Sequence, residues 1–225
     1  MGAARDAGAA LRAEVDAVAR GAGIGFVGVA DTAGVPAPFA DYPRAVVAAV
    51  PLSRGVLAGC VAEPTREYGY HYRVVNGALD QLACRVAAFL EGRGFATYAV
   101  GASHITDWGA LTGAVSHPRL AAAAALGRIG RHGMLVTPRF GAGVRLVSVF
   151  TTAPLPAAAP AAGAGGCDGC GACQRACPAG AIGDGAAAWR KDKCRALLTE
   201  FKRRITNQYI CGVCVRACAQ AAAMR

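Results

Sequence analysis

The chain has 225 residues, a hydrophobic fraction of 54% and a formal net charge of +10. Alanine inflates that fraction, and no run of eighteen uncharged apolar residues occurs, which excludes a membrane-spanning helix. Charged residues from Asp6 to Asp16 interrupt any apolar N-terminal segment, so we expect no export signal and a cytoplasmic protein.

The first 100 residues alternate between helix-forming and strand-forming patterns. Leu11, Val15 and Val18 would share one face of an amphipathic helix. Two short apolar runs predict buried strands, and a loop with three prolines separates them. A longer helix then precedes a third strand. The predicted elements are a helix over 6–21, strands over 24–30 and 44–50, a helix over 70–91 and a strand over 95–100.

Residues 116–152 combine a helix, a glycine-rich turn and a predicted hairpin. Ser116 is placed to cap the helix, with Pro118 in the first turn. The glycines of the turn would let the backbone approach a ligand or another element closely. The predicted bounds are 117–127 for the helix, 126–133 for the turn, and 134–137 and 144–152 for the hairpin strands. This irregular alternation is typical of an α+β fold.

The C-terminal segment carries eight cysteines in the spacing of a two-cluster bacterial ferredoxin. These are Cys167, Cys170, Cys173, Cys177, Cys194, Cys211, Cys214 and Cys218. Closely spaced cysteines each reach a different iron of one 4Fe–4S cubane, whereas the fourth cysteine of such a run serves the other cluster. The spacing therefore assigns Cys167, Cys170, Cys173 and Cys218 to one cluster, and Cys177, Cys194, Cys211 and Cys214 to the other.

Zinc binding and disulfide bonding are the alternative explanations for these cysteines. A zinc site also uses Cys-x-x-Cys pairs, but it does not need the third cysteine or the following Cys177-Pro178. A disulfide framework needs an oxidising compartment, which nothing at the N-terminus suggests. The spacing therefore favours two iron–sulfur clusters.

Two features depart from the spacing of a small ferredoxin. Ala219, rather than a proline, follows the last cysteine. Sixteen residues separate Cys194 from Cys211, and we expect an inserted helix over about 195–204 to fill this interval. Cys60 and Cys84 lie outside the pattern. We predict that both are buried small hydrophobic residues.

Two explanations are open for the positive charge. Each oxidised cluster with four thiolates carries about two negative charges, which nearby basic residues would offset. Alternatively, a residual positive field would attract nucleic acid, an anionic cofactor or an acidic electron donor. Lys202, Arg203 and Arg204 form a basic group that is either such a binding surface or a solvated helix face.

The segment before the cysteines resembles a known family in order, spacing and residue identity. It reads Ser116-His117-Pro118, then Leu126-Gly127-Arg128-Ile129-Gly130-Arg131-His132-Gly133-Met134, then Thr137-Pro138, Gly141 and Val144-Arg145-Leu146. With the cysteines that follow, it resembles the epoxyqueuosine reductase family and its relatives, the cobalamin-dependent reductive dehalogenases. The resemblance covers residues 116–218.

This resemblance implies a fold of two domains. The first is a nitroreductase-like α+β domain over 1–155, and the second is a bacterial-ferredoxin-like domain with two 4Fe–4S clusters over 167–225, after a linker over 156–166 that is rich in alanine, proline and glycine. The implied function is an iron–sulfur oxidoreductase that passes low-potential electrons to a cofactor or substrate in the first domain. The alternative is a non-catalytic electron-transfer protein.

Cofactors and partners follow from the same resemblance. In relatives the α+β domain holds cobalamin, and the nearer cluster reduces its cobalt. By this carry-over, the residues that border the cofactor are Gly127, Arg128, Gly130, Gly133 and Arg145. Tight packing between elements is the alternative role for the glycines. The implied partners are ferredoxin or flavodoxin as electron donor, and a small molecule or modified nucleoside as substrate.

A two-electron reduction that ends on carbon needs a proton donor. The family has a catalytic aspartate before the glycine turn; ungapped counting places Leu111 there, and Asp107 is the nearest carboxylate. Asp107 and His104 are three residues apart in a predicted loop and could form an acid–base group. Ordinary hydrogen bonding within the loop is the alternative explanation, and His117 is a further candidate.

Overall fold

The structure, a computed structural model, describes residues 2–159, 167, 169–183 and 189–224. It is a mixed fold of helices and an open sheet. Residues 160–166 of the predicted linker lie outside the described residues. No helix in the described part of the chain is long and apolar enough to cross a membrane.

The chain divides into two compact units, each built from three separate stretches. The first unit comprises Met1–Val50, Asn76–Leu126 and Arg145–Ala161, and the second comprises Pro51–Val75, Gly127–Val144 and Ala162–Arg225. The cysteine-rich segment therefore shares its unit with two earlier segments of the chain. The division into independent domains over 1–155 and 167–225 stays a prediction.

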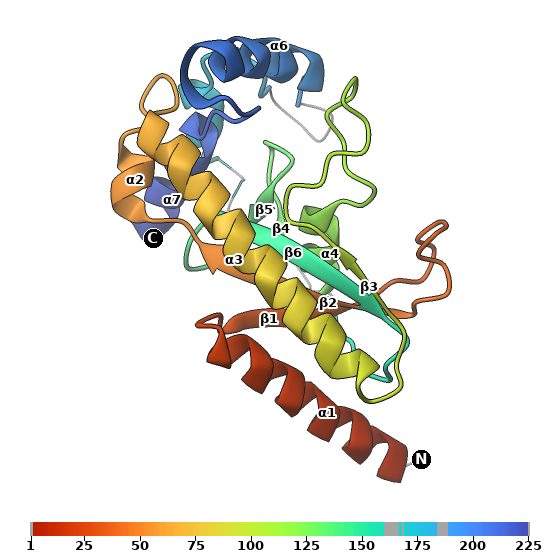
Figure 1. The fold of residues 1–225 in the computed structure, drawn as a ribbon. Coiled ribbons are helices and arrows are strands. Elements are labelled where there is room, and N and C mark those ends of the chain that lie inside the picture. The colour runs from red at the N-terminus through yellow and green to blue at the C-terminus, as the bar shows by residue number, and fades with distance from the viewer. Residues whose placement is uncertain (1, 160–166, 168, 184–188, 225) are drawn as a thin grey trace. The chain divides into compact units, whose positions relative to one another are not determined.

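An open four-stranded sheet forms the centre of the first unit (Figure 1). Its strand order is β1-β2-β6-β3, and the pairs β1–β2 and β3–β6 are antiparallel. The strands are β1 (Phe26–Asp31), β2 (Arg44–Pro51), β3 (Thr97–Val100) and β6 (Val144–Thr151). Alanine and valine fill the buried positions of β2, as its apolar run predicted, and the buried positions of β6 also hold Leu146 and Phe150. The three predicted strands of the first 100 residues are confirmed, with small shifts at their ends.

Helices α1 (Gly2–Gly21), α3 (Arg66–Glu91) and α4 (His117–Ala123) accompany this sheet. The Arg12 guanidinium on α1 donates to the Val27 carbonyl of β1 at 2.9 Å, which ties the helix to the edge strand. Helix α3 starts before the predicted residue 70 and crosses from the second unit into the first. Helix α4 ends before the predicted residue 127, because Ala125 adopts a left-handed backbone conformation with φ +58°.

The loop between β1 and β2 contributes an aromatic residue to the core. Phe39 is 2% exposed and stacks on Phe150 of β6 with ring centroids 4.4 Å apart. The Tyr98 ring of β3 contacts the Phe39 ring edge-on, with ring centroids 4.9 Å apart. The proline-rich loop that the sequence predicted is therefore anchored by a residue that its composition did not single out.

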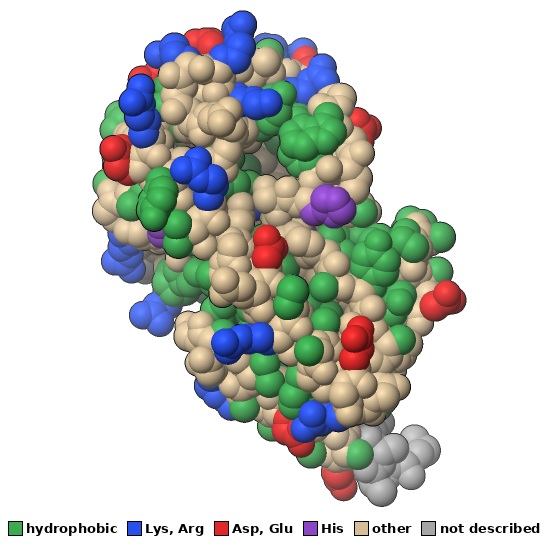
Figure 2. All heavy atoms as spheres, viewed as in Figure 1, with side chains coloured by type: hydrophobic (Ala, Val, Ile, Leu, Met, Phe, Trp, Pro, Cys, Tyr) green, Lys and Arg blue, Asp and Glu red, His purple; other side chains and the backbone are tan. Residues whose placement is uncertain are grey.

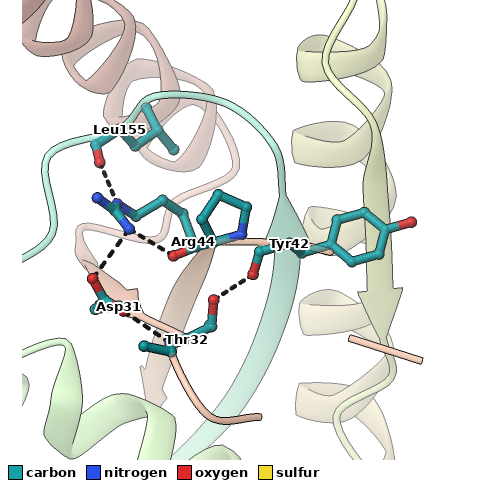
Figure 3. Close-up of polar contacts among 7 residues, drawn as sticks. Asp31, Thr32, Tyr42, Arg44 and Leu155 are labelled. Carbon is teal, nitrogen blue, oxygen red and sulfur yellow. Dashed lines mark hydrogen bonds and ion pairs between the residues drawn. The ribbon is translucent and has the colours of Figure 1, made fainter. Parts of the chain in front are cut away.

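Arg44 at the start of β2 holds three segments of the first unit together (Figure 3). Its guanidinium donates to the Leu155 carbonyl at 2.9 Å and pairs with the Asp31 carboxylate at 3.1 Å. Asp31 is also the cross-strand neighbour of Arg44. Thr32 donates a short hydrogen bond to the Tyr42 carbonyl, which closes the loop next to this pair. The segment after β6 is thereby fastened to the β1–β2 end of the sheet.

The hairpin predicted between 134–137 and 144–152 is wrong. In the second unit, β5 (Leu135–Val136) pairs with β4 (Arg128–Ile129), in antiparallel register. The intervening turn is closed by a hydrogen bond from Gly133 N–H to the Gly130 carbonyl at 2.9 Å, with φ +74° at Gly133. The strand β6 already has β2 on one edge and β3 on the other, so it offers no free edge to β5.

The remaining helices belong to the second unit. They are α2 (Arg54–Ala58), α5 (Ala172–Ala176), α6 (Lys191–Phe201), the π-helical segment η1 (Lys202–Thr206) and α7 (Val213–Ala223). Helix α7 packs against both α5 and α2. The inserted helix predicted over about 195–204 is confirmed, because α6 and η1 together cover it.

Gly28 allows β1 to lie against α4 in the first unit, so Gly28→Ala should destabilise the protein. A Cβ at Gly28 would lie 2.5 Å from the Ala124 carbonyl oxygen and 2.9 Å from the Ala124 Cβ. Such overpacking costs about 1–3 kcal/mol. We expect a lower thermal unfolding midpoint, at about 2–4 °C per kcal/mol.

Gly77→Ala is the matched control, because Gly77 lies inside α3 and a Cβ there would have no neighbour within 4 Å. There alanine should stabilise the helix by up to about 1 kcal/mol. An equal midpoint for the two variants would contradict the packing account.

Candidate functional site

Four cysteines from two helical regions of the second unit come together in what we call the first cysteine set. Its members are Cys167, Cys170, Cys173 and Cys218. Burial above all, together with negative charge on the other three thiols, raises the pKa of Cys218 to about 11. Burial, followed by the charge of Cys167, likewise raises the pKa of Cys173. The packing of α5 against α7 brings these thiols near one another.

The remaining four cysteines form the second cysteine set. They are Cys177, Cys194, Cys211 and Cys214. Burial above all, together with the charges of Cys194 and Cys177, raises the pKa of Cys211 to about 12. Burial also raises the pKa of Cys214, followed by the charges of Cys211, Cys194 and Cys177. The charge of Cys173, from the first set, makes the smallest contribution to this rise in the pKa of Cys214. The two sets are therefore close neighbours.

Hydrogen bonds reach sulfurs in both sets. The donors are the backbone N–H groups of Ala142 to Cys218, Val213 to Cys211 and Ala181 to Cys177, and the Trp189 side chain to Cys194. The Ala181 nitrogen lies 3.4 Å from its sulfur. Such bonds stabilise a thiolate, and around iron–sulfur clusters they tune the reduction potential. The surroundings of the cysteines are therefore suited to charged sulfur ligands.

A tight turn over residues 137–141 fits closely against Cys218. Gly141 has φ +53°, and a Cβ there would lie 2.6 Å from the Cys218 carbonyl oxygen. The buried Thr137 hydroxyl donates to the Gly141 carbonyl and accepts from the Phe140 N–H, both at 3.1 Å. The turn positions the Ala142 N–H that bonds Cys218. Sequence reasoning noted Gly141 but missed this contact.

None of the ten cysteines, all of which are described, forms a disulfide. Within the described residues, no three His, Cys, Asp or Glu side chains are placed to hold a single metal ion. Ligands of one zinc ion each lie about 2.3 Å from it, whereas cubane ligands each bind a different iron and spread wider. Of the two remaining cysteines, Cys60 is buried as predicted. Cys84 is exposed, so its predicted burial is wrong: it faces outward on α3.

The glycines predicted to border a cofactor lie against protein atoms within the second unit. A Cβ at Gly127 would lie 2.4 Å from the Val136 carbonyl, one at Gly130 2.8 Å from the His132 ring, and one at Gly133 2.6 Å from the Trp189 ring. Arg128 sits in β4, opposite Val136. This geometry supports the packing alternative, and a cofactor role for these residues stays a prediction.

Arg145 belongs to a polar cluster of the first unit. Its guanidinium donates to Asn76 Oδ1 at 3.0 Å and to the Ala102 carbonyl at 2.9 Å. Asp80, one turn after Asn76 on α3, accepts from the Ala102 N–H at 2.8 Å. The sequence pointed to Arg145 but not to Asn76 or Asp80, whose polar side chains interrupt the apolar pattern of α3.

His117 lies in the same cluster and is held as a neutral imidazole. Its Nε2 is 3.0 Å from the Gly101 carbonyl and its Nδ1 is 2.8 Å from the Ser148 hydroxyl. A carbonyl only accepts, so Nε2 carries the proton and Nδ1 accepts from Ser148. Burial, above all, lowers the pKa of His117 to about 4.

Asp107 and His104 lie on an exposed loop of the first unit. The Asp107 backbone bridges Thr112, and its carboxylate accepts from the Ala110 N–H at 2.9 Å. Leu111 closes this turn with φ +50°. In the described part of the chain no hydrogen bond joins Asp107 to His104. Their local contacts match the loop alternative, and the acid–base pair stays a prediction.

Lys and Arg side chains gather over α6 in the second unit (Figure 2). At its end, Arg204 pairs with Glu63 and lies 3.6 Å from Glu200, and Lys202 lies 4.4 Å from the Tyr209 ring centre. These contacts support the solvated-face explanation for the group Lys202, Arg203 and Arg204.

The fold of this chain was compared with families, curated sequences and solved structures. No protein-family model and no curated protein sequence matches the chain. Solved structures do match it, with identities of 20% or less. At this identity the likeness establishes the fold.

Two kinds of reductase share this fold. A reductive dehalogenase, whose structure is described as suggesting a mechanism for B12-dependent dehalogenation, aligns with 93% of the chain at 18% identity and a TM-score of 0.75. An epoxyqueuosine reductase, solved with a modified tRNA-Tyr stem loop, aligns with 95% at 19% identity and a TM-score of 0.61. The Bacillus subtilis epoxyqueuosine reductase, with its catalytic aspartate loop swung out of the active site, aligns with 92% at 19% identity and a TM-score of 0.58.

The likeness to epoxyqueuosine reductase and dehalogenase folds that the sequence suggested is therefore confirmed, and the ferredoxin-like nature of residues 167–225 stays a prediction. The chain spans 31–32% of the length of the dehalogenases and 64–65% of the length of these epoxyqueuosine reductases.

Acid should destabilise the protein through His117. Its pKa is about 4 when folded and near 6.5 when unfolded, so the unfolded state binds more protons between these values. Stability is then full above about pH 6.5 and is lost as pH falls, by about 2 kcal/mol at pH 5. The measurement is the unfolding midpoint at pH 7 and pH 5 for wild type and His117→Gln.

We expect a shallower pH dependence for His117→Gln than for wild type. His104→Gln, at an exposed loop position, should retain the wild-type dependence. Identical slopes for all three proteins would refute the buried neutral imidazole.

Proposed function

We propose that the protein is an iron–sulfur oxidoreductase that passes low-potential electrons from two 4Fe–4S clusters to an acceptor held by the sheet-centred unit. One observation supports the proposal: α5 packs against α7 in the second unit, and Cys218 interacts mainly with Cys167, Cys170 and Cys173, whereas Cys211 interacts mainly with Cys194 and Cys177. This grouping supports the membership that ferredoxin spacing predicts, with crossed use of Cys177 and Cys218.

The chemistry of both sets suits clusters. Thiols that are buried and close together resist ionisation, as the raised pKa values of Cys211 and Cys218 indicate. Iron supplies the positive charge that makes thiolates favourable in such a place. N–H donors at Cys218, Cys211, Cys177 and Cys194 would hold the cluster ligands and raise the reduction potential.

Two destinations for these electrons differ in kind: a cofactor within the protein, or another protein. Reductases with this fold support a cofactor, cobalamin above all, which when bound would supply a metal centre for reducing a small molecule or modified nucleoside. Asp107 would then give the proton, as the aspartate loop of the Bacillus subtilis reductase suggests, with His104 beside it. The alternative is a non-catalytic electron carrier, favoured by the protein atoms that cover Gly127, Gly130 and Gly133.

Holoprotein purified without oxygen should contain about eight iron and eight acid-labile sulfide per chain. Cys177→Ser should damage the second cluster and Cys218→Ser the first, because each belongs to the set remote from its sequence neighbours. Electron paramagnetic resonance of the reduced variants distinguishes the two losses. Cys84→Ser, an exposed cysteine outside both sets, is the control that should retain both signals.

One tightly bound zinc without labile sulfide would overturn the cluster proposal. Loss of the same signal in Cys177→Ser and Cys218→Ser would overturn the crossed assignment alone.

Titration with cobalamin separates the enzyme from the carrier. Binding at micromolar concentration, followed by cobalt reduction that Cys218→Ser slows at least tenfold, would support the reductase. The readout is the cobalt absorption spectrum, and direct calorimetry measures binding independently. Intact clusters with no cobalamin binding would instead support the carrier or a different acceptor.

A further inference from the structure

A cavity of about 140 Å³ in the second unit is positively charged around an apolar floor. Arg54 of α2, Arg139 of the turn over residues 137–141 and Arg216 of α7 line it, and none of its lining residues is acidic. Leu57, Phe140 and Ala219 supply apolar surface between the guanidinium groups. We call this the arginine cavity.

Within the part of the chain that the structure describes, the arginines of the cavity lack acidic partners. Among the described residues, none of the recorded ion pairs involves Arg54, Arg139 or Arg216. The Nε of Arg216 is buried without a hydrogen-bond partner, although its Nη1 donates to Gln220 at 3.1 Å. A buried donor without a partner is rare in proteins, and a guanidinium binds carboxylate groups through two parallel hydrogen bonds. The cavity is therefore suited to an incoming anionic group.

The size of the cavity decides what kind of anion fits. Pockets for whole cofactors or drug-sized ligands enclose about 300–1,000 Å³. The arginine cavity, at about 140 Å³, has room for one acidic side chain but not for a nucleotide or flavin. Arginine and aromatic residues around such a small pocket are typical of the centre of a protein–protein interface.

The arginine cavity adjoins the first cysteine set. Ala219, which lines it, follows Cys218 directly, and Phe140 flanks the Gly141 that touches the Cys218 carbonyl. The neighbouring Ala142 N–H donates to the Cys218 sulfur. A protein seated on the cavity would therefore bring its own redox centre close to the cluster that we propose there.

We propose that the arginine cavity is the docking point of an acidic one-electron carrier protein of the ferredoxin class, and thus the entry point for electrons. This inference rests on the proposed function, because it requires the first cluster. The cluster that Cys167, Cys170, Cys173 and Cys218 would hold would accept one electron from the reduced carrier, which would be oxidised by one electron. Opposite charges steer the encounter and set its orientation.

Stopped-flow reduction of the oxidised holoprotein by a pre-reduced acidic plant-type ferredoxin tests the proposal. We expect the second-order rate constant to fall as ionic strength rises. Arg54→Glu and Arg139→Glu reverse exposed charges at the cavity rim and should each lower the rate at least tenfold. Arg203→Glu, an exposed arginine of η1, makes the same charge change away from the cavity and should stay within twofold of wild type.

The measurements distinguish failure of the proposed function from failure of the docking site. Iron and sulfide analysis comes first, and a protein without clusters refutes the proposed function itself. If clusters are present and dithionite reduces them equally in every variant, unchanged ferredoxin rates in Arg54→Glu and Arg139→Glu overturn the docking site alone. A larger effect at Arg203→Glu overturns it in favour of the basic group on η1. Calorimetric binding of inorganic phosphate that Arg139→Glu abolishes, with unchanged ferredoxin rates, would overturn it in favour of a small-anion site.

Discussion

The second unit depends on a contact that leaves no room for a side chain. Gly141 approaches the Cys218 carbonyl so closely that a Cβ would lie only 2.6 Å away, and its φ of +53° favours glycine as well. This fit holds the turn over residues 137–141 on α7, where the Ala142 N–H reaches a sulfur and Phe140 forms one wall of the arginine cavity. The turn, the hydrogen bond to the Cys218 sulfur and the Phe140 wall of the cavity therefore all depend on the absence of a side chain at position 141.

Apart from the crossed grouping of Cys177 and Cys218, what the sequence could predict was local. The cysteine spacing constrains which thiols reach one another within a few residues, and the apolar runs of β1 and β2 mark strands without further information. The pairing of β5 with β4 could not be predicted from such local patterns. Short strands take whichever edge is free, and the edges of β6 were already occupied by β2 and β3, which only the assembled sheet reveals.

Polar partners within the candidate site were equally hidden. Arg145 stood out because of its place in a recognisable segment, but Asn76 comes from a helix 69 residues earlier. Cys84 shows the converse error: apolar neighbours at helical spacing suggested burial, although the residue faces outward on α3. Helical periodicity indicates the buried face of a helix only approximately. Whether a residue at the edge of that face is buried depends on what packs against the helix.

The second unit is assembled from three stretches of chain, and this limits how the cysteine-rich segment can be inherited or transplanted. Tyr68 covers Gly212 beside Cys211, and Ala142 reaches Cys218, yet both residues precede the cysteines by many positions. A segment exchanged from residue 167 onward would therefore arrive without part of its own surroundings. Modularity in this protein follows the contacts rather than the order of the chain, so recombination between relatives should preserve all three stretches together.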